Sequence, residues 1–389
     1  MNQTLETIKQ DIIASVERNM SVIGTRNPMV GAGPNDFTWL YPEDYFWTDS
    51  FWTGQLWLAY LFTGKQELKN NARMRNGHFQ NILNNPLWLN HDLGFEYSLS
   101  AVADYKLTGN QDARNLALRA AEALRNRYNW NGNYIVAWTA GAEDKAHAES
   151  VQGKIIIDCM QNLALLMWAY AETNVESFKQ VAIGQAETSM KYLIRDDYST
   201  YHTFDFDTRT NQPVKGCTHQ GFADESCWSR GQAWAIHGFA QMALMTGDDR
   251  YAQESVKLTE YMLTKITPDM VPEWDYLLTE GETRYKDTSA GSITSAGLFI
   301  LAEYFTKTNN SSLADYYYDL AKTMLLALRE NYDLTNTESA QGLLSNAASH
   351  IPNAKTHNLE HLANSMLPYG DYYYFEAVAR ALGHNKLFW

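Results

Sequence analysis

Five threonine turns divide this chain of 389 residues into units of similar make-up. Before each turn runs an aromatic-rich apolar stretch, and after it comes a more polar stretch with helical periodicity. The turns recur after 45 to 73 residues. This recurrence, with a helical period on both sides, predicts a repeated α-helical hairpin rather than a sheet. The turns are Thr63-Gly64, Thr108-Gly109, Thr173-Asn174, Thr246-Gly247 and Thr308-Asn309.

Twelve helices are predicted, in six pairs of one apolar and one amphipathic member. A helix that is apolar all round must be buried, whereas an amphipathic helix covers a core with one face. Six such pairs can close into an all-α ring, an (α/α)6 barrel, with the apolar helices inside. The predicted inner helices span 50–62, 93–107, 156–172, 228–245, 290–307 and 371–382. The predicted outer helices span 4–22, 66–84, 112–128, 176–194, 249–266 and 311–330.

The hairpins follow one another without a Pro/Ser-rich linker or a block of charge, so residues 1–389 are predicted to form a single domain. The formal net charge of −14 and the lack of a basic run argue against nucleic acid and anionic membranes as partners. No apolar stretch is suited to span a bilayer, and the N-terminal sequence does not resemble a signal peptide. Three cysteines without a CxxC pair fit a cytoplasmic protein.

Polar and aromatic residues gather where the predicted inner helices begin. Because the inner helices of a closed ring run parallel, their six N-terminal ends meet at one mouth. The sequence therefore predicts a pocket at that mouth. The segments that would line it are FWTDSFW (46–52), HDLGFEY (91–97), IIIDCMQN (155–162), THQGFADESCWSRGQAW (218–234), DTSAGS (287–292) and YGDYYYFE (369–376).

Two aspartates at this mouth are candidates for acid–base chemistry. Asp158 follows three isoleucines, and removal from water would raise its pKa enough for it to act as a general acid near neutral pH. A helix N-cap that binds free backbone amides is an equally good interpretation of Asp158. For Asp92 taken alone, the cap is the better interpretation, although the adjacent His91 favours a polar site. Two acids at one mouth are the minimum for glycosidic chemistry.

Tryptophans with polar neighbours can stack on sugar rings, although aromatic residues on buried helices more often belong to the core. Trp47, Trp138, Trp228 and Trp234 have such neighbours. Arg230 lies in an apolar setting and needs an anion, either an internal partner such as Asp224 or a carboxylate of the ligand. The internal ion pair is somewhat favoured. The ten histidines show no metal-ligand spacing, so neither a metal nor another cofactor is expected.

Taken together, these segments resemble the unsaturated glucuronyl hydrolases, bacterial enzymes that act late in polysaccharide degradation. The resemblance runs nearly from end to end, and the order and spacing of its motifs make chance agreement implausible. The motifs are WTDSFWTGQLWL (47–58), HDLGFEYSLSA (91–101), IIIDCMQNLALLMWA (155–169), SxYHTF (199–204), THQG with WSRGQAW (218–234), and GDYYYFEA (370–377). The family fold is an (α/α)6 barrel, as the repeat analysis predicts.

The resemblance implies roles for nine residues. Asp158 matches the general acid/base of the family, and Asp92 matches its second essential aspartate. Two departures bear on the leaving sugar: Tyr369 stands where the family commonly has Trp, and the segment 349–367 is atypical. The positions that match substrate-binding residues are Trp47, His91, Trp138, His202, Gln220, Arg230 and Trp234.

The implied activity is release of a 4,5-unsaturated uronic acid from the non-reducing end of an oligosaccharide, most readily a disaccharide derived from a glycosaminoglycan. The resemblance implies hydration of the C4=C5 double bond without a cofactor, by a monomer or small homo-oligomer. An unsaturated rhamnogalacturonyl hydrolase would share the ring. A sugar 2-epimerase on the same toroid would use His91 and His202 as its pair of bases. A non-catalytic sugar-binding or scaffolding protein is the third class.

Overall fold

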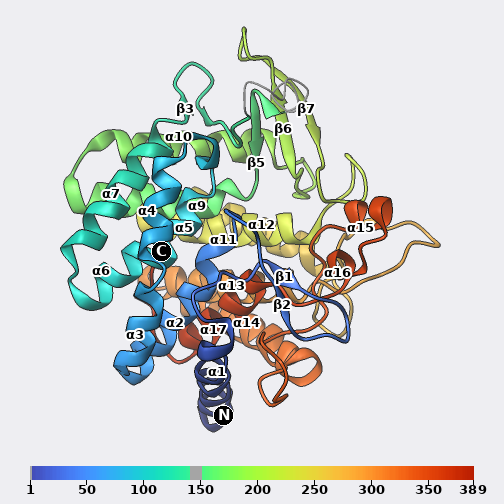
Figure 1. The fold of residues 1–389 in the computed structure, drawn as a ribbon. Coiled ribbons are helices and arrows are strands. Elements are labelled where there is room, and N and C mark those ends of the chain that lie inside the picture. Colours follow the sequence, from blue (N-terminus) through green and yellow to red (C-terminus); the bar gives the residue numbers. More distant parts are fainter. Residues whose placement is uncertain (1, 141–150) are drawn as a thin grey trace.

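The structure, a computed structural model, describes residues 2–140 and 151–389. Within this part of the chain the six apolar segments form a closed ring, in which each contacts the next and the last returns to the first (Figure 1). The predicted all-α barrel is therefore confirmed. The inner segments are α2 (Asp49–Thr63), α5 (Leu93–Tyr97) continued by the π-helical turn η2 (Ser98–Val102) and α6 (Ala103–Thr108), α9 (Cys159–Thr173), α11 (Ser229–Thr246), α13 (Thr288–Lys307) and α17 (Pro368–Ala381).

The amphipathic segments form the outer layer, and each buries one face. The predicted helix 66–84 is two helices, because the chain turns at Met74 and Arg75. The buried Arg75 guanidinium donates to the carbonyls of Gly24 and Arg26 at 2.6 and 3.0 Å, at the end of α1. The outer helices are α1 (Asn2–Ile23), α3 (Gln66–Arg73), α4 (Asn76–Asn84), α7 (Gln111–Arg125), α10 (Glu176–Tyr192), α12 (Asp249–Leu263) and α14 (Ser311–Tyr332).

The threonine turns have a common geometry. At the first, Thr63 Oγ1 donates to the carbonyl of Ala59 at 2.8 Å, and Gly64 is left-handed with φ 66°. The hydroxyl thus satisfies a carbonyl that the end of the helix leaves free, and the left-handed residue stops the helix. The other four threonines donate in the same way to the carbonyls of Asp104, Ala169, Met242 and Tyr304.

Short antiparallel strands, which the sequence did not predict, lie in the connections at the mouth end of the barrel. The inner helix predicted from 156 begins only at Cys159, because Lys154–Ile156 is strand β5, where Ile155 pairs with Phe204. β-Branched isoleucines suit that paired conformation. The strands are β1 (Val30–Gly31), β2 (Trp39–Leu40), β3 (Tyr128–Asn129), β4 (Tyr134–Ile135), β5, β6 (Thr203–Phe206) and β7 (Pro213–Cys217).

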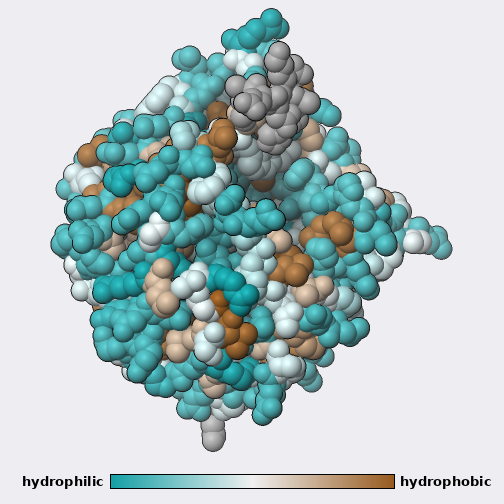
Figure 2. Space-filling view, viewed as in Figure 1, coloured by the Kyte–Doolittle hydropathy of each residue, from teal (hydrophilic) through white to brown (hydrophobic). Residues whose placement is uncertain are grey.

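Three short helices complete the described fold: η1 (Pro86–Trp88), α15 (Ile351–His357) and α16 (Glu360–Ala363). The face shown in Figure 2 is largely hydrophilic, with hydrophobic side chains in small separate spots. Among the residues placed by the structure, no helix combines the length and apolar character needed to cross a bilayer. The apolar residues are instead collected between the two layers of helices.

Helices α5 and α9 touch at a glycine. A Cβ atom on Gly94 would lie 2.2 Å from the Cα of Asn162, so only glycine permits this approach. Gly77, in the outer helix α4, is exposed and a Cβ there would meet nothing within 4 Å. Substitution of alanine at each of the two glycines therefore separates the effect of helix packing on stability from the effect of helix propensity.

We predict that Gly94→Ala lowers the free energy of unfolding by about 1–3 kcal/mol, because the helices must move apart. Gly77→Ala, the matched control, should raise it by about 0.5–1 kcal/mol, since alanine favours the helix more than glycine does. Urea unfolding of both variants checks this. Equal effects of the two substitutions would contradict the close approach of α5 and α9.

Candidate active site

A cavity of about 710 Å³ opens where the inner helices begin, at the mouth that the sequence predicted. Its walls come from the segments that precede α2, α5, α9 and α17 and from the loops around β5–β7. The structure brings seven of the nine predicted site residues into this wall. They are Trp47, His91, Asp92, Trp138, Asp158, His202 and Gln220.

The other two predicted residues, Arg230 and Trp234, lie outside the wall. The Arg230 guanidinium is buried, with its Nη1 2.5 Å from Asp287 and 2.6 Å from the carbonyl of Ala348. Its internal partner is Asp287 and not Asp224, which the sequence had offered as an example. Trp234 is buried between Phe95 and the C-terminal helix α17. Both residues support the pocket from behind.

Asp158 stands immediately before α9, but its side chain makes no capping bond to the helix. Its Oδ1 is buried and has no hydrogen-bond partner among the described residues. Burial raises the pKa of Asp158 to about 7, against the opposing charge of Arg230. Of the two interpretations that the sequence left open, the geometry therefore favours the general acid over the N-cap.

Asp92 has the same position before α5 and likewise makes no capping bond with its side chain. Burial, together with the negative charge of Asp158, raises its pKa well above the usual value, and the positive charge of Arg127 opposes the rise. The Nδ1 atom of His91 lies 3.5 Å from Asp92 Oδ1. Both acids are therefore harder to ionise than a carboxyl group in water, and for Asp92 the nearby charge of Asp158 adds to the effect of burial.

The protonation state of His202 follows from its hydrogen bonds. Its Nδ1 accepts from the backbone N–H groups of His219 and Gln220, both at 3.1 Å, so Nδ1 carries no proton. Burial holds the pKa of His202 well below the usual value, so the ring is neutral and its proton resides on Nε2. That nitrogen lies 3.7 Å from Oδ1 of Asp158. His202 therefore presents an N–H group beside the acid.

Asn162 connects the starts of two inner helices. Its side-chain oxygen accepts from the backbone N–H of Phe95 in α5 at 2.7 Å. Its amide nitrogen lies 3.3 Å from the carbonyl of Asp158 and 3.4 Å from Nδ1 of His91. Asn162 follows Asp158 by four residues, one helical turn, and its contact with Phe95 also fixes the position of α5.

Sequence reasoning missed Arg127, which lies behind Asp92. Its guanidinium donates to the carbonyls of Leu89 at 2.6 Å and Val136 at 2.9 Å. Burial lowers its pKa to about 10. In the sequence this arginine lies near the end of the predicted amphipathic helix 112–128 and looks like a surface residue. No local pattern could have shown that its charge reaches the site.

The far side of the cavity comes from the segment 349–367 and from α17. The sequence had identified this segment as atypical and as a wall of the leaving-sugar pocket, but without naming residues. Arg230 holds its beginning, since Nη2 donates to the carbonyl of Ser349 at 2.6 Å. The side chains that reach the cavity from here are Ser349, His350, Asn353, His361, Leu362 and Tyr369.

The described residues contain no group of three or more His, Cys, Asp or Glu side chains that could hold a metal ion. Two acid–imidazole pairs face this site: Asp92 with His91 at the start of α5, and Asp158 at the start of α9 with His202, which precedes β6. Such pairs can donate and accept a proton at a bound sugar without a metal.

Comparison with known proteins decides the family. No protein-family model matches the chain. The chain is 34% identical over 377 residues to the unsaturated glucuronyl hydrolase of Bacillus sp. GL1. The aligned region covers 95% of this chain and 94% of the relative. The chain belongs to the unsaturated glucuronyl hydrolase family.

Other members of the family agree in sequence and in structure. The unsaturated chondroitin disaccharide hydrolase of Streptococcus agalactiae is 35% identical, over 88% of this chain and 83% of that protein. The Bacillus crystal structure superposes with a TM-score of 0.90 at 32% identity and covers 99% of this chain and 98% of its own. The protein is therefore a glycoside hydrolase of the unsaturated glucuronyl hydrolase type.

One buried acid near this family site has no role in the pairs described above. Glu96 lies one helical turn after Asp92 and is fully buried, and neither carboxyl oxygen has a hydrogen-bond partner among the described residues. Burial raises its pKa well above the usual value, and the charges of Asp49 and Asp92 raise it further. Folding therefore favours the protonated form of Glu96.

We predict that Glu96→Gln stabilises the protein by an amount that grows with pH. Unfolding frees Glu96 to ionise with a pKa of about 4.3, so wild-type stability falls as pH rises above that value until the folded-state pKa is reached. Glutamine has no proton to lose. Thermal unfolding at pH 4 should show little difference between the two proteins, and at pH 7.5 a higher Tm for the variant. A lower Tm at both pH values would contradict a protonated Glu96.

We predict that Arg230→Ala lowers the free energy of unfolding by about 3–5 kcal/mol, because Asp287 is left buried without a partner. Arg250→Ala is the matched control, since its ion pairs with Asp248 and Glu187 are exposed and their loss should change the Tm little. Unfolding and kcat/KM should be measured on both variants. An unchanged Tm with a large loss of kcat/KM would mean that Arg230 acts mainly on the substrate.

Proposed function

We propose that this hydrolase removes a 4,5-unsaturated uronic acid from the non-reducing end of disaccharides derived from glycosaminoglycans. Two observations support the substrate class. Relatives from three Streptococcus species are named unsaturated chondroitin disaccharide hydrolases. A mutant of the Streptococcus agalactiae enzyme, 30% identical to this chain, has a crystal structure in complex with dGlcA-GalNAc6S.

The reaction we propose is hydration of a double bond. The C4=C5 bond of such a uronate is joined to the ring oxygen as a vinyl ether. A proton added at C4 leaves a cation at C5, which the ring oxygen stabilises. Water then adds at C5 and releases a proton. The resulting hemiketal opens and frees the second sugar together with a 4-deoxy-5-keto uronic acid.

Asp158 is the proposed donor of the proton to C4 and, once ionised, the base that takes the proton from water. The observation that carries this role is its buried carboxyl group, with a pKa of about 7 and a free Oδ1 at the cavity. Asp92 orients the substrate and raises the pKa of its neighbour. The N–H group of His202, beside Oδ1, suits a uronate oxygen.

The remaining substrate contacts are proposed from the family resemblance and from placement in the wall. Trp47 and Trp138 are positioned to stack on sugar rings, and His91 and Gln220 supply polar groups. Arg230 acts through a neighbour, since it lies 4.5 Å from the Trp228 ring, which is tilted against the ring of His202. The side chain of Trp234 interacts with Asp158 and opposes the rise of its pKa. The part of Arg230 and Trp234 in binding is to hold the wall in place.

Proton abstraction by histidines, as in a sugar 2-epimerase, fits this site less well. Burial lowers the pKa of His91 to about 3, which makes it a weak base. Nδ1 of His202 is occupied by two backbone N–H groups, and Nε2 carries the proton. Neither ring is therefore poised to accept a proton from C2 of a sugar.

The unsaturated rhamnogalacturonyl hydrolase type is the nearer alternative, since only the leaving sugar differs. Assays with unsaturated chondroitin, hyaluronan and rhamnogalacturonan disaccharides, which follow loss of ultraviolet absorbance, separate the possibilities. An epimerase or a non-catalytic binder leaves the chromophore intact, whereas hydration destroys it. The identity of the disaccharide consumed fastest reports the leaving sugar.

We also propose that residues 1–389 act as a single catalytic domain in the cytoplasm, as a monomer or small homo-oligomer, without nucleic acid or membrane partners. The three free, buried thiols of Cys159, Cys217 and Cys227 fit a reducing compartment. Residues 141–150, which fall within this domain, lie outside the described part of the chain. Sedimentation velocity of the purified protein tests the oligomeric state.

We predict that Asp158→Asn folds normally and lowers kcat by a factor of about 10³ or more, because no other group supplies the proton. In the wild type, kcat/KM should fall about tenfold per pH unit above pH 7, where the acid with a pKa of about 7 loses its proton. Asp207→Asn is the control, because Asp207 is partly exposed and does not line the cavity, and it should keep both the rate and its pH dependence. Near-normal turnover by Asp158→Asn would place the acid elsewhere.

We predict that solvent deuterium enters at C4 and that oxygen-18 from water enters at C5. The reaction should be run in labelled water and sampled early with trapping, because the ketone that forms exchanges its oxygen. Mass spectrometry and NMR of the released uronate locate the labels. Oxygen-18 at C1 with the double bond intact would instead make Asp158 and Asp92 an ordinary glycosidase pair.

A further inference from the structure

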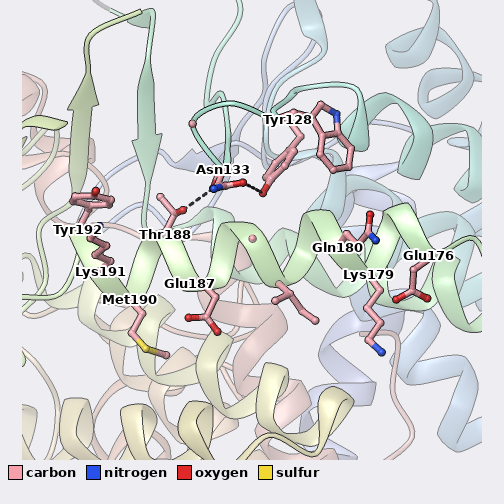
Figure 3. A pocket seen from close by; sticks show the side chains of 14 residues that line it. Tyr128, Asn133, Glu176, Lys179, Gln180, Glu187, Thr188, Met190, Lys191 and Tyr192 are labelled. Atoms are coloured by element: carbon pink, nitrogen blue, oxygen red, sulfur yellow. Dashed lines mark hydrogen bonds between the residues drawn. The ribbon is translucent and has the colours of Figure 1, made fainter. Parts of the chain in front are cut away.

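A second cavity, of about 700 Å³, lies on the outer face of the ring between the β3–β4 hairpin and α10 (Figure 3). It shares no lining residue with the cavity that holds Asp158. The hairpin is fixed to the helix, because Thr188 Oγ1 donates to the carbonyl of Asn133 at 2.6 Å and Gln185 Oε1 accepts from Ile135 N at 2.6 Å. The groove is therefore preformed.

Glycine permits the close contact at the base of this groove. A Cβ atom on Gly184 would lie 1.9 Å from the hydroxyl of Tyr128, so a larger residue in α10 would push the hairpin away. The ring of Tyr128 is thereby held against the helix (Figure 3). One aromatic wall of the groove is rigid.

Trp130, at the tip of the hairpin, is 57% exposed. It is the only tryptophan among the exposed large apolar side chains of residues 2–140 and 151–389. Its ring stands edge to face against Tyr128, with centroids 4.9 Å apart and an angle of 84°. More than half of the surface of Trp130 remains accessible to a partner. Covering this surface is favourable, because an indole carries a large apolar area.

The other wall is polar and balanced in charge. Glu176, Lys179 and Gln180 line the groove from the first half of α10. In Figure 3, Gln180 points towards the hairpin, whereas Lys179 points to the other side of the helix. Towards the other end, the carboxylate of Glu187 already binds Arg250 at 2.8 Å. Two glutamates and two lysines line the groove, so it carries no net charge although the chain carries −14.

An exposed indole beside carboxylate, ammonium and amide groups suits a sugar ring. The ring stacks through its C–H face, and its hydroxyls both donate and accept hydrogen bonds. A protein partner would need a wider apolar surface, because stable interfaces have an apolar core and bury more than about 1,000 Å². Nucleic acid would need a cationic groove.

We propose that this outer groove is a second carbohydrate-binding site, which holds an uncharged sugar unit of an oligosaccharide on Trp130. It is separate from the catalytic cavity and does not depend on the hydration reaction proposed above.

Binding should be tested by calorimetric titration of the full chain with two neutral probes, cellohexaose and N-acetylchitohexaose. We expect wild type to bind at least one with a Kd near 1 mM, and Trp130→Ala to bind it at least tenfold more weakly. Tyr316→Ala is the matched control, because Tyr316 is an exposed aromatic residue on α14, away from the groove. It should bind as wild type does.

Three results would overturn the proposal. The first is no binding of either hexaose by wild type at about 10 mM, and the second is equal binding by wild type and Trp130→Ala. The third is self-association of wild type that Trp130→Ala abolishes in sedimentation velocity, since the groove would then be a contact between copies of the chain. The rate on unsaturated chondroitin disaccharide, measured in parallel, should agree within about twofold for all three proteins. If wild type lacks this activity, the hexaose titration still tests the groove.

Discussion

The position of the site depends on the contact between Asn162 and the start of α5. Through one side chain, the backbone of Phe95 is fixed to α9, and the same amide lies near the carbonyl of Asp158 and the ring of His91. The absent Cβ of Gly94 is what allows the two helices to come this close. Because Asp92 precedes one of these helices and Asp158 the other, the contact sets how strongly the two acids interact. The raised pKa of Asp92 is therefore a property of helix packing as well as of burial.

The buried acids show how a barrel of this kind accommodates charge without bulk water. Asp287 is neutralised by Arg230, and Asp371 is bound by the backbone N–H groups of Leu343 and Leu344. Asp158 and Glu96 have oxygens with no partner among the described residues, and both have raised pKa values. The acid that faces the cavity can use its proton in catalysis. Glu96 does not face the cavity, and its burial only lowers the free energy of unfolding.

The helical ring was predictable because its signals are local. Each Thr-Gly or Thr-Asn turn carries its own hydrogen bond and left-handed residue, and each inner helix is apolar on every side. The grouping of Asp92 and Asp158 also followed, once the motifs had been placed at the starts of parallel helices, whereas His202 was named only from the family resemblance. The partner of Arg230 was not predictable, since Asp287 lies 57 residues further along the chain. The start of α9 was missed because pairing with β6, which the sequence did not reveal, keeps Ile155 and Ile156 in a strand.

The two ends of the barrel differ in how much chain connects the helices. At the end opposite the mouth, where the threonine turns lie, the connections are two or three residues long and satisfy their own hydrogen bonds, as at 64–65 and 247–248. At the mouth, the connections are long and irregular, as at 193–228 and 333–367, and several of them supply the cavity wall. Selection can therefore lengthen, shorten or replace a mouth loop while the ring still closes. Changes in the mouth loops can therefore alter the substrate that such a barrel binds, while the turns at the opposite end continue to stabilise the ring.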